Sequence, residues 1–107
     1  TNPTMRTDGI ERQRLAGVLK AMGHPTRLGI LQRVARGEWC VSRLEETLGQ
    51  SQANISQHLS LLRERGLVVP ERKGNRICYR LADDRIREII ALAAAVFAKR
   101  APRAKAA

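Results

Sequence analysis

The fold is decided by VSRLEETLGQ at residues 41–50, SQANISQHLSLLRERG at 51–66 and LVVPERKGNRICYRL at 67–81. The first two segments carry leucine and isoleucine at helical spacing, and each has a glycine at or near its end. The third has two strand-like runs separated by a charged turn. This order predicts two short helices followed by a basic β-hairpin, which is a winged helix-turn-helix. Because such a helix fits the major groove and such a hairpin can hold phosphate, we expect a DNA-binding protein.

The second of these helices has a clear division between two faces. Ile55, Leu59 and Leu62 share one side, and small or polar residues such as Ser56 and Gln57 lie opposite. A structural surface helix more often carries Glu and Lys there, whereas a recognition helix presents short polar side chains to base edges. The predicted base-reading residues are Gln52, Asn54, Ser56 and Gln57.

The hairpin is expected to form the wing, with strands at 67–70 and 76–81 joined by residues 71–75. Gly74 and Asn75 tolerate the positive φ of a tight turn. Positive side chains at the tip favour contact with the DNA backbone or the minor groove, although a solvated loop would carry similar residues. The predicted wing contacts are Arg72, Lys73, Asn75 and Arg76.

The flanking segments predict four further elements. Helices are expected at 10–22 and from Pro25 to Gly37, then a short strand at 38–41, with Ser42 capping the next helix. A last helix at 84–100 carries an apolar stripe broad enough for a second partner.

We therefore predict a mainly α protein with a small β-hairpin, in the order α-α-β-α-α-β-β-α, that forms a homodimer through its first and last helices. The predicted organisation is a flexible N-terminus at 1–9, one DNA-binding and dimerisation domain at 10–100, and a flexible basic tail at 101–107.

Composition limits the classes of function. Twenty basic residues against ten acidic ones give a charge of +10 in 107 residues, which favours polyanions, namely nucleic acid or an anionic membrane surface. With the helices and wing described above, we expect the partner to be double-stranded DNA and not a membrane. The apolar run at 89–98 is too short to cross a membrane, and residues 1–9 have no apolar core of the signal-peptide type. Two cysteines without a disulfide-rich pattern point to a reducing cytoplasm. No acid–base pair, phosphate loop or nucleophile–base spacing stands out, so we expect neither an enzyme nor a cofactor.

Four segments resemble the arsenical-resistance repressor (ArsR) family in order and spacing: LKAMGHPTRLGIL, GEWCVSRLEETLG, SQANISQHLSLLRERGLV and RKGNRICYRL. The resemblance covers about residues 10–97. It implies a homodimeric winged-helix repressor that leaves its operator when an inducer binds or a thiol is modified. By family position, residues 52–57 would meet the major groove and residues 72–76 would form the wing.

The metal sites of the family do not match this sequence. One of them resembles Cys-Val-Cys, but here the run is Cys40-Val41-Ser42, and a hydroxyl is a poor ligand for a soft ion. Another uses Asp and His pairs on the last helix, whereas the only histidines are His24 and His58, which lie elsewhere. We expect both histidines to be structural hydrogen-bonding residues and expect no metal site.

The two cysteines are the candidate signal site. In this fold the short strand before the third helix pairs with the returning wing strand, which would make Cys40 and Cys78 cross-strand neighbours about 4.5–5.5 Å apart at Cα. Arg76 and Arg80 flank Cys78 and would favour its thiolate. The hypothesis is a dithiol switch, in which oxidants or reactive sulfur species link the two sulfurs and lower operator affinity.

Three alternatives remain open at this point. Both cysteines could be inert small hydrophobic residues. They could instead hold a soft ion such as As(III) together with a third ligand. The fold could also serve as a protein-interaction module that does not bind DNA.

Overall fold

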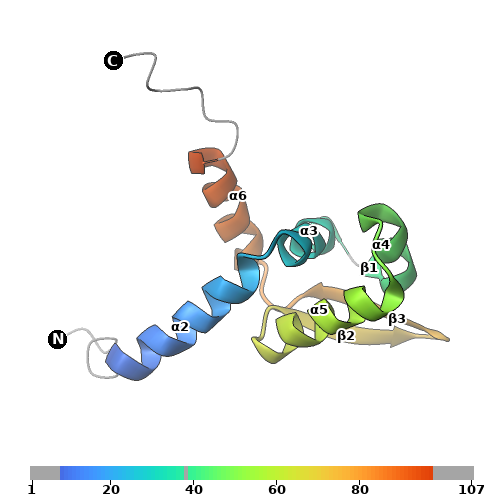
Figure 1. Ribbon diagram of the computed structural model, residues 1–107, viewed down its shortest axis with the longest axis horizontal. Coiled ribbons are helices and arrows are strands. Elements are labelled where there is room, and N and C mark those ends of the chain that lie inside the picture. Colours follow the sequence, from blue (N-terminus) through green and yellow to red (C-terminus); the bar gives the residue numbers. More distant parts are fainter. Residues whose placement is uncertain (1–7, 38, 98–107) are drawn as a thin grey trace, which may run out of the picture.

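The computed structural model describes residues 8–37 and 39–97, and it has the predicted order of elements (Figure 1). The helices and strands follow the chain as α2 (Asp8–Met22), α3 (Pro25–Val34), β1 (Trp39–Cys40), α4 (Val41–Leu48), α5 (Gln52–Glu64), β2 (Val68–Lys73), β3 (Arg76–Leu81) and α6 (Arg85–Phe97). The winged helix-turn-helix fold is therefore confirmed. Of the predicted flexible N-terminus at 1–9, residues 1–7 lie outside the described residues, whereas Asp8 and Gly9 begin α2. The predicted tail at 101–107 and the predicted end of the last helix at residue 100 also lie outside the described residues.

The sheet has three antiparallel strands in the order β1-β3-β2. The predicted loop at 71–75 is wrong, because β2 continues to Lys73, which pairs with Arg76. Only Gly74 and Asn75 lie between the two strands, and Gly74 has the predicted positive φ, at 64°. Cross-strand pairing thus extends the wing almost to its tip and leaves a two-residue turn.

The core lies where α3, α4 and α5 pack against one another and against the sheet. Each fully buried leucine or isoleucine side chain stabilises the fold by roughly 1.5–3 kcal/mol. The largest of these are Ile30, Leu31, Leu44, Ile55, Leu59 and Leu62.

Helix α5 has the two predicted faces. Ile55, Leu59 and Leu62 are buried, whereas Ser56 and Gln57 are exposed. Ser51 caps this helix, since its hydroxyl accepts a hydrogen bond from the backbone N–H of Asn54 at 3.1 Å. The apolar face of α5 packs against α3, α4 and β2, and its polar face therefore points to solvent.

Helix α4 begins two residues earlier than a cap at Ser42 would require. Val41 is its first residue, Cys40 occupies the N-cap position, and no side chain caps it there. The Ser42 cap is therefore wrong, because the pairing of Trp39 and Cys40 with β3 leads the chain directly from the strand into the helix. This junction places Cys40 at the start of the helix-turn-helix.

Helices α2 and α6 extend away from the body (Figure 1). Arg27 holds the end of α2, since its guanidinium donates to the carbonyl oxygens of Ala21 at 2.6 Å and Lys20 at 3.3 Å. Arg87 of α6 similarly donates to the Ala35 carbonyl beyond α3, at 2.7 Å. Within the described residues, no helix is both long and apolar enough to span a membrane.

Candidate nucleic-acid interface

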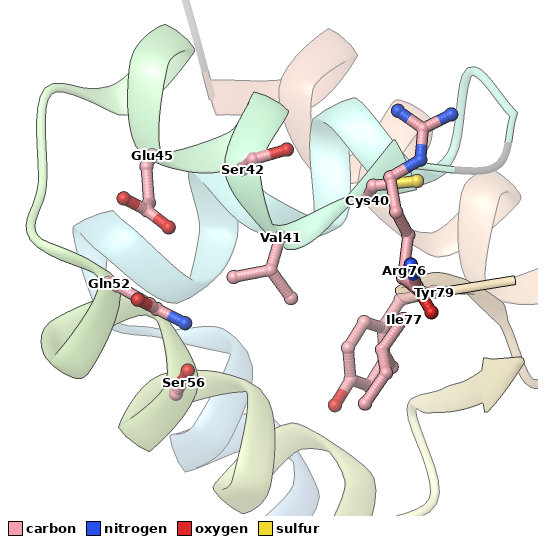
Figure 2. A pocket seen from close by; sticks show the side chains of 10 residues that line it. Cys40, Val41, Ser42, Glu45, Gln52, Ser56, Arg76, Ile77 and Tyr79 are labelled. Atoms are coloured by element: carbon pink, nitrogen blue, oxygen red, sulfur yellow. The ribbon is translucent and has the colours of Figure 1, made fainter. Parts of the chain in front are cut away.

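Helix α5 and the wing border an open hollow of about 400 Å³, called here the wing hollow (Figure 2). Four of the predicted DNA-contacting residues line it: Gln52 and Ser56 from α5, and Asn75 and Arg76 from the wing. The structure thus brings the start of the recognition helix and the tip of the wing to one concave surface. The rest of its lining is Cys40, Val41, Ser42, Glu45, Ile77 and Tyr79.

The other four predicted residues lie outside this hollow. Gln57, Arg72 and Lys73 are exposed on α5 and β2. Asn54 is partly buried, and its side-chain amide donates a hydrogen bond to the Gln50 side chain. Asn54 is therefore held against the loop before α5, and Gln50 is a positioning residue that sequence reasoning missed. The four-residue spacing across a helix start is the signal that could have found it.

The charge on this surface is mixed. Arg72, Lys73 and Arg76 are all exposed and surround the turn of the wing. Farther from the turn, Arg80 pairs with Glu71 at 3.7 Å. Glu45 places one carboxylate in the wing hollow itself. Positive charge is therefore concentrated at the tip of the wing, as phosphate contact requires.

Cys40 and Cys78 are directly opposed in the sheet and joined by a disulfide. The prediction of cross-strand neighbours is confirmed, and their Cα atoms are 3.7 Å apart, closer than expected. The bond connects the residue before α4 to the middle of β3. It therefore ties the first helix of the helix-turn-helix to the wing.

The charges around Cys78 differ from the expected pair of flanking arginines. Glu71 of β2 lies opposite Cys78, and this carboxylate forms the ion pair with Arg80. The charge of Arg80 is thus partly offset beside the sulfur. Arg76 is exposed at the start of β3 and lines the wing hollow together with Cys40.

A tryptophan adjoins the disulfide. Trp39 pairs with Tyr79 across the sheet, and the guanidinium carbon of Arg43 lies 4.4 Å from its ring centroid. Trp39 is the only tryptophan in the sequence. Its fluorescence therefore reports on one place in the chain, the residue next to Cys40.

The two histidines lie together at the junction of α3 and α5. His24 is the N-cap of α3, and its Nδ1 accepts from the backbone N–H of Thr26 at 3.1 Å, as expected of a structural residue. His58 has its ring centroid 4.7 Å from that of His24 and its Nδ1 3.5 Å from the Arg27 guanidinium. Burial, and then the charges of His24 and Arg27, lower the pKa of His58 below its usual 6.5.

The described part of the chain offers no cluster of metal-binding side chains. Among residues 8–37 and 39–97, no three His, Cys, Asp or Glu side chains gather closely enough to hold an ion. Cys40 and Cys78 are joined by a disulfide and would supply two thiolates only after reduction.

Comparison with known proteins places this geometry among bacterial regulators. The family described as "Bacterial regulatory protein, arsR family" matches residues 24–69. An uncharacterized HTH-type transcriptional regulator of Methanocaldococcus jannaschii is 40% identical over 81 residues, covering 75% of this chain and 91% of that protein. The biofilm growth-associated repressor of Xylella fastidiosa is 34% identical over 92 residues, covering 84% and 81%.

A solved structure shares the fold. The homodimeric winged helix-turn-helix DNA-binding domain of a possible ArsR-family regulator from Mycobacterium bovis superposes with a TM-score of 0.80 and 29% identity. The match covers 90% of this chain and 89% of that one.

Proposed function

Since the chain belongs to the arsR family of bacterial regulatory proteins, we propose that it is a dimeric, DNA-binding transcriptional repressor that oxidation of Cys40 and Cys78 releases from its operator. The observation that carries this proposal is the disulfide between the start of α4 and the wing. The proposal assigns no catalytic activity to the chain.

The DNA-binding part of the proposal rests on the surface formed by α5 and the wing. Gln52, Ser56 and Gln57 are exposed polar side chains near the start of α5, where a recognition helix meets base edges. Arg72 and Arg76 stand exposed on the wing, where guanidinium groups can contact the phosphate backbone. The charge of +10 favours such a partner.

The proposal of a dimer is supported by the exposed apolar residues of α2 and α6. Leu19 of α2 and Ile89 and Phe97 of α6 are large apolar side chains that remain about half exposed or more. They line one open apolar groove of about 460 Å³, bordered by α2, α3 and α6. A second copy of the chain would bury this surface and pair two recognition helices for a two-fold operator. The related domain from Mycobacterium bovis is homodimeric.

The proposal of a redox switch is supported by the position of the disulfide. A major-groove helix and a wing must reach the duplex at a set relative position. Cys40 directly precedes α4, which packs on α5, and Cys78 lies within the wing. A covalent bond between them restricts how the helix-turn-helix and the wing move relative to each other. Opening and closing this bond therefore supplies two arrangements of the same DNA-binding surface, of which the reduced one would bind the operator more tightly.

The same two sulfurs favour a second candidate signal, a thiophilic ion such as As(III). Two thiolates make a weaker site than three, so a third ligand, for example a thiol of the partner subunit, would be needed. In that case the reduced protein would show thiolate-to-metal absorbance on titration, and mild oxidants would not be required for release.

The experiment measures binding of the protein to the promoter of its own gene by mobility shift, against random DNA of equal length. It compares the protein with reductant, with oxidant, with polysulfide and with thiophilic ions. The proposal predicts salt-dependent, promoter-selective binding that oxidant or polysulfide abolishes. Release by As(III) alone would identify the second candidate, and equal binding to promoter and random DNA would identify a module without operator recognition.

A further inference from the structure

The two cysteines differ in how far a molecule from solvent can reach them. Cys78 is 2% exposed and lies in β3, the central strand, between β1 and β2. Cys40 is partly exposed in the edge strand β1 and lines the wing hollow, whose lining does not include Cys78. A reagent that enters the hollow therefore meets Cys40 first.

The surroundings of Cys40 also stabilise a thiolate better than those of Cys78. It occupies the N-cap position of α4, and its side chain makes no capping hydrogen bond. The first backbone N–H groups of a helix lack partners within the helix and favour negative charge. The first turn of α4 carries no acidic residue. Arg76 and Glu45 both line the hollow, so one cation and one anion face it from the wing and from α4.

The surroundings of Cys78 disfavour its thiolate. Burial favours the neutral thiol over the charged form. The residue opposite it in β2 is Glu71, which pairs with Arg80, so the positive charge of this arginine gives a thiolate little support. Since the thiolate is the reactive form of cysteine, Cys78 is the slower of the two toward a reagent from solvent.

Taking the proposed function as given, we infer that Cys40 is the modification site that receives the signal and that Cys78 is the resolving residue. The chemical class of the signal is a small two-electron electrophile, such as a hydroperoxide or an inorganic polysulfide, that fits the wing hollow. The two sulfurs thus act in a fixed order.

With hydrogen peroxide, the Cys40 thiolate attacks one oxygen, a sulfur–oxygen bond forms, and the oxygen–oxygen bond breaks. Cys40 is oxidised to a sulfenic acid and hydroxide leaves. The Cys78 sulfur then attacks the Cys40 sulfur and forms the disulfide. Hydroxide is displaced and takes the Cys78 proton, so the second step releases water.

With hydrogen disulfide the order is the same. The Cys40 thiolate takes one sulfur atom as the sulfur–sulfur bond of the reagent breaks, and hydrosulfide leaves. The Cys78 sulfur then attacks the Cys40 sulfur of the persulfide and displaces a second hydrosulfide, which takes the Cys78 proton and leaves as hydrogen sulfide. Both routes end in the same Cys40–Cys78 bond.

The test uses two variants, Cys78→Ala and Cys40→Ala, each reduced and then exposed to hydrogen peroxide in the presence of dimedone, which traps sulfenic acids. Peptide mass spectrometry then locates the adduct. We expect Cys40 in Cys78→Ala to be labelled about tenfold faster or more than Cys78 in Cys40→Ala. A parallel arm with sodium disulfide and a persulfide-trapping reagent shows which electrophile reacts faster.

A second measurement needs no substitution at the buried position. Reduced wild-type protein is treated with limiting N-ethylmaleimide, and the alkylated cysteine is identified. Cys40 is expected to carry most of the label. This keeps the inference testable if Cys78→Ala does not fold.

Equal labelling of the two cysteines, or preferential labelling of Cys78, would overturn the order. So would disulfide formation in the wild type with no trapped species in either variant. These results leave the proposed function intact as long as oxidised wild-type protein still releases DNA. If oxidised protein binds DNA unchanged while Cys40 is labelled first, the proposed function fails and the order of attack stands.

Discussion

Two faces of this chain expose opposite kinds of side chains. The polar face consists of Gln52, Ser56 and Gln57 on α5 together with residues 72–76 of the wing, all exposed. The apolar face consists of Leu15 and Leu19 on α2 with Ile89, Leu92 and Phe97 on α6. Leu92 is 67% exposed and Phe97 73%, whereas the core residues Ile30, Leu44 and Ile55 are fully buried.

The difference shows that α3, α4, α5 and the sheet bury their apolar side chains in one core, whereas α2 and α6 leave large apolar side chains exposed. Helices α3, α4 and α5 pack against one another and the sheet, whereas exposed apolar area of this extent on helices is typical of an interface. One face is suited to a charged polymer and the other to a second copy of the chain. Substitutions on the apolar face should therefore alter subunit assembly, whereas substitutions on the polar face should alter DNA affinity and leave the dimer intact.

The largest effect is expected from Ile89→Glu on the apolar face. A buried charge at the dimer interface would separate the subunits, and a monomer that meets one half-site loses an avidity gain on the order of 10²–10⁴. Sedimentation velocity would show a monomer, and fluorescence anisotropy would show the loss of operator binding. The wild-type side chain is already 49% exposed, so the monomer should still fold.

The matched control is Ala91→Glu, which adds the same charge to the same helix about 200° away from Ile89. It should remain dimeric and bind the operator. A dimeric Ile89→Glu protein would contradict the assignment of the apolar face.

Gln57→Ala on the polar face should have the next largest effect. Loss of a base contact costs about 1–3 kcal/mol of discrimination, so operator affinity should fall about tenfold to a hundredfold while binding to random DNA is unchanged. The measurement is a competition titration with both DNAs. Ser60→Ala, exposed farther along α5, is the control. Equal losses on both DNAs would argue against base reading by Gln57.

Lys73→Ala should have a smaller and less selective effect. A phosphate contact contributes equally to every sequence, so both DNAs should bind a few-fold more weakly. The slope of log affinity against log salt should decrease by about one for each lysine removed. Titrations at several salt concentrations measure this slope. An unchanged slope with reduced affinity would mean that Lys73 supports the wing without meeting the backbone.

The smallest effect concerns His58, which lies at the junction of α3 and α5. Its pKa is lowered in the folded chain, so the unfolded chain takes up the proton more readily as the pH falls below about 6.5. The free energy of unfolding should therefore decrease from pH 7.5 to 5.5 by more in the wild type than in His58→Gln. Urea unfolding of both proteins at both pH values measures this free energy. Identical pH dependence in the two proteins would show that His58 does not contribute.

Local patterns predicted the polar face well. Ile55, Leu59 and Leu62 repeat at helical spacing and Ser51 caps the same helix, so residues within one helix were enough to orient α5. The opposition of Cys40 and Cys78 followed from strand alternation together with the pairing typical of the fold. The apolar stripe on α6 likewise showed in the sequence as a surplus over what one core needs.

Features set by contacts between distant segments were missed. The start of α4 depends on the pairing of Trp39 with Tyr79, which overrode the capping preference of Ser42. The length of β2 depends on Glu71 and Arg72 pairing with β3. The wing hollow, which gathers Gln52 with Arg76, depends on how the wing lies relative to α5. No single window of sequence contains these contacts.

The most direct measurement is the operator affinity of one wild-type preparation in three states: reduced, disulfide-linked and reduced again, with Cys40→Ser carried through the same cycle. Trp39 fluorescence follows the local change in each state. We predict that the disulfide weakens operator binding about five- to 150-fold, that reduction restores it, and that Cys40→Ser binds alike throughout. Equal affinity of the reduced and disulfide-linked wild type would contradict the account.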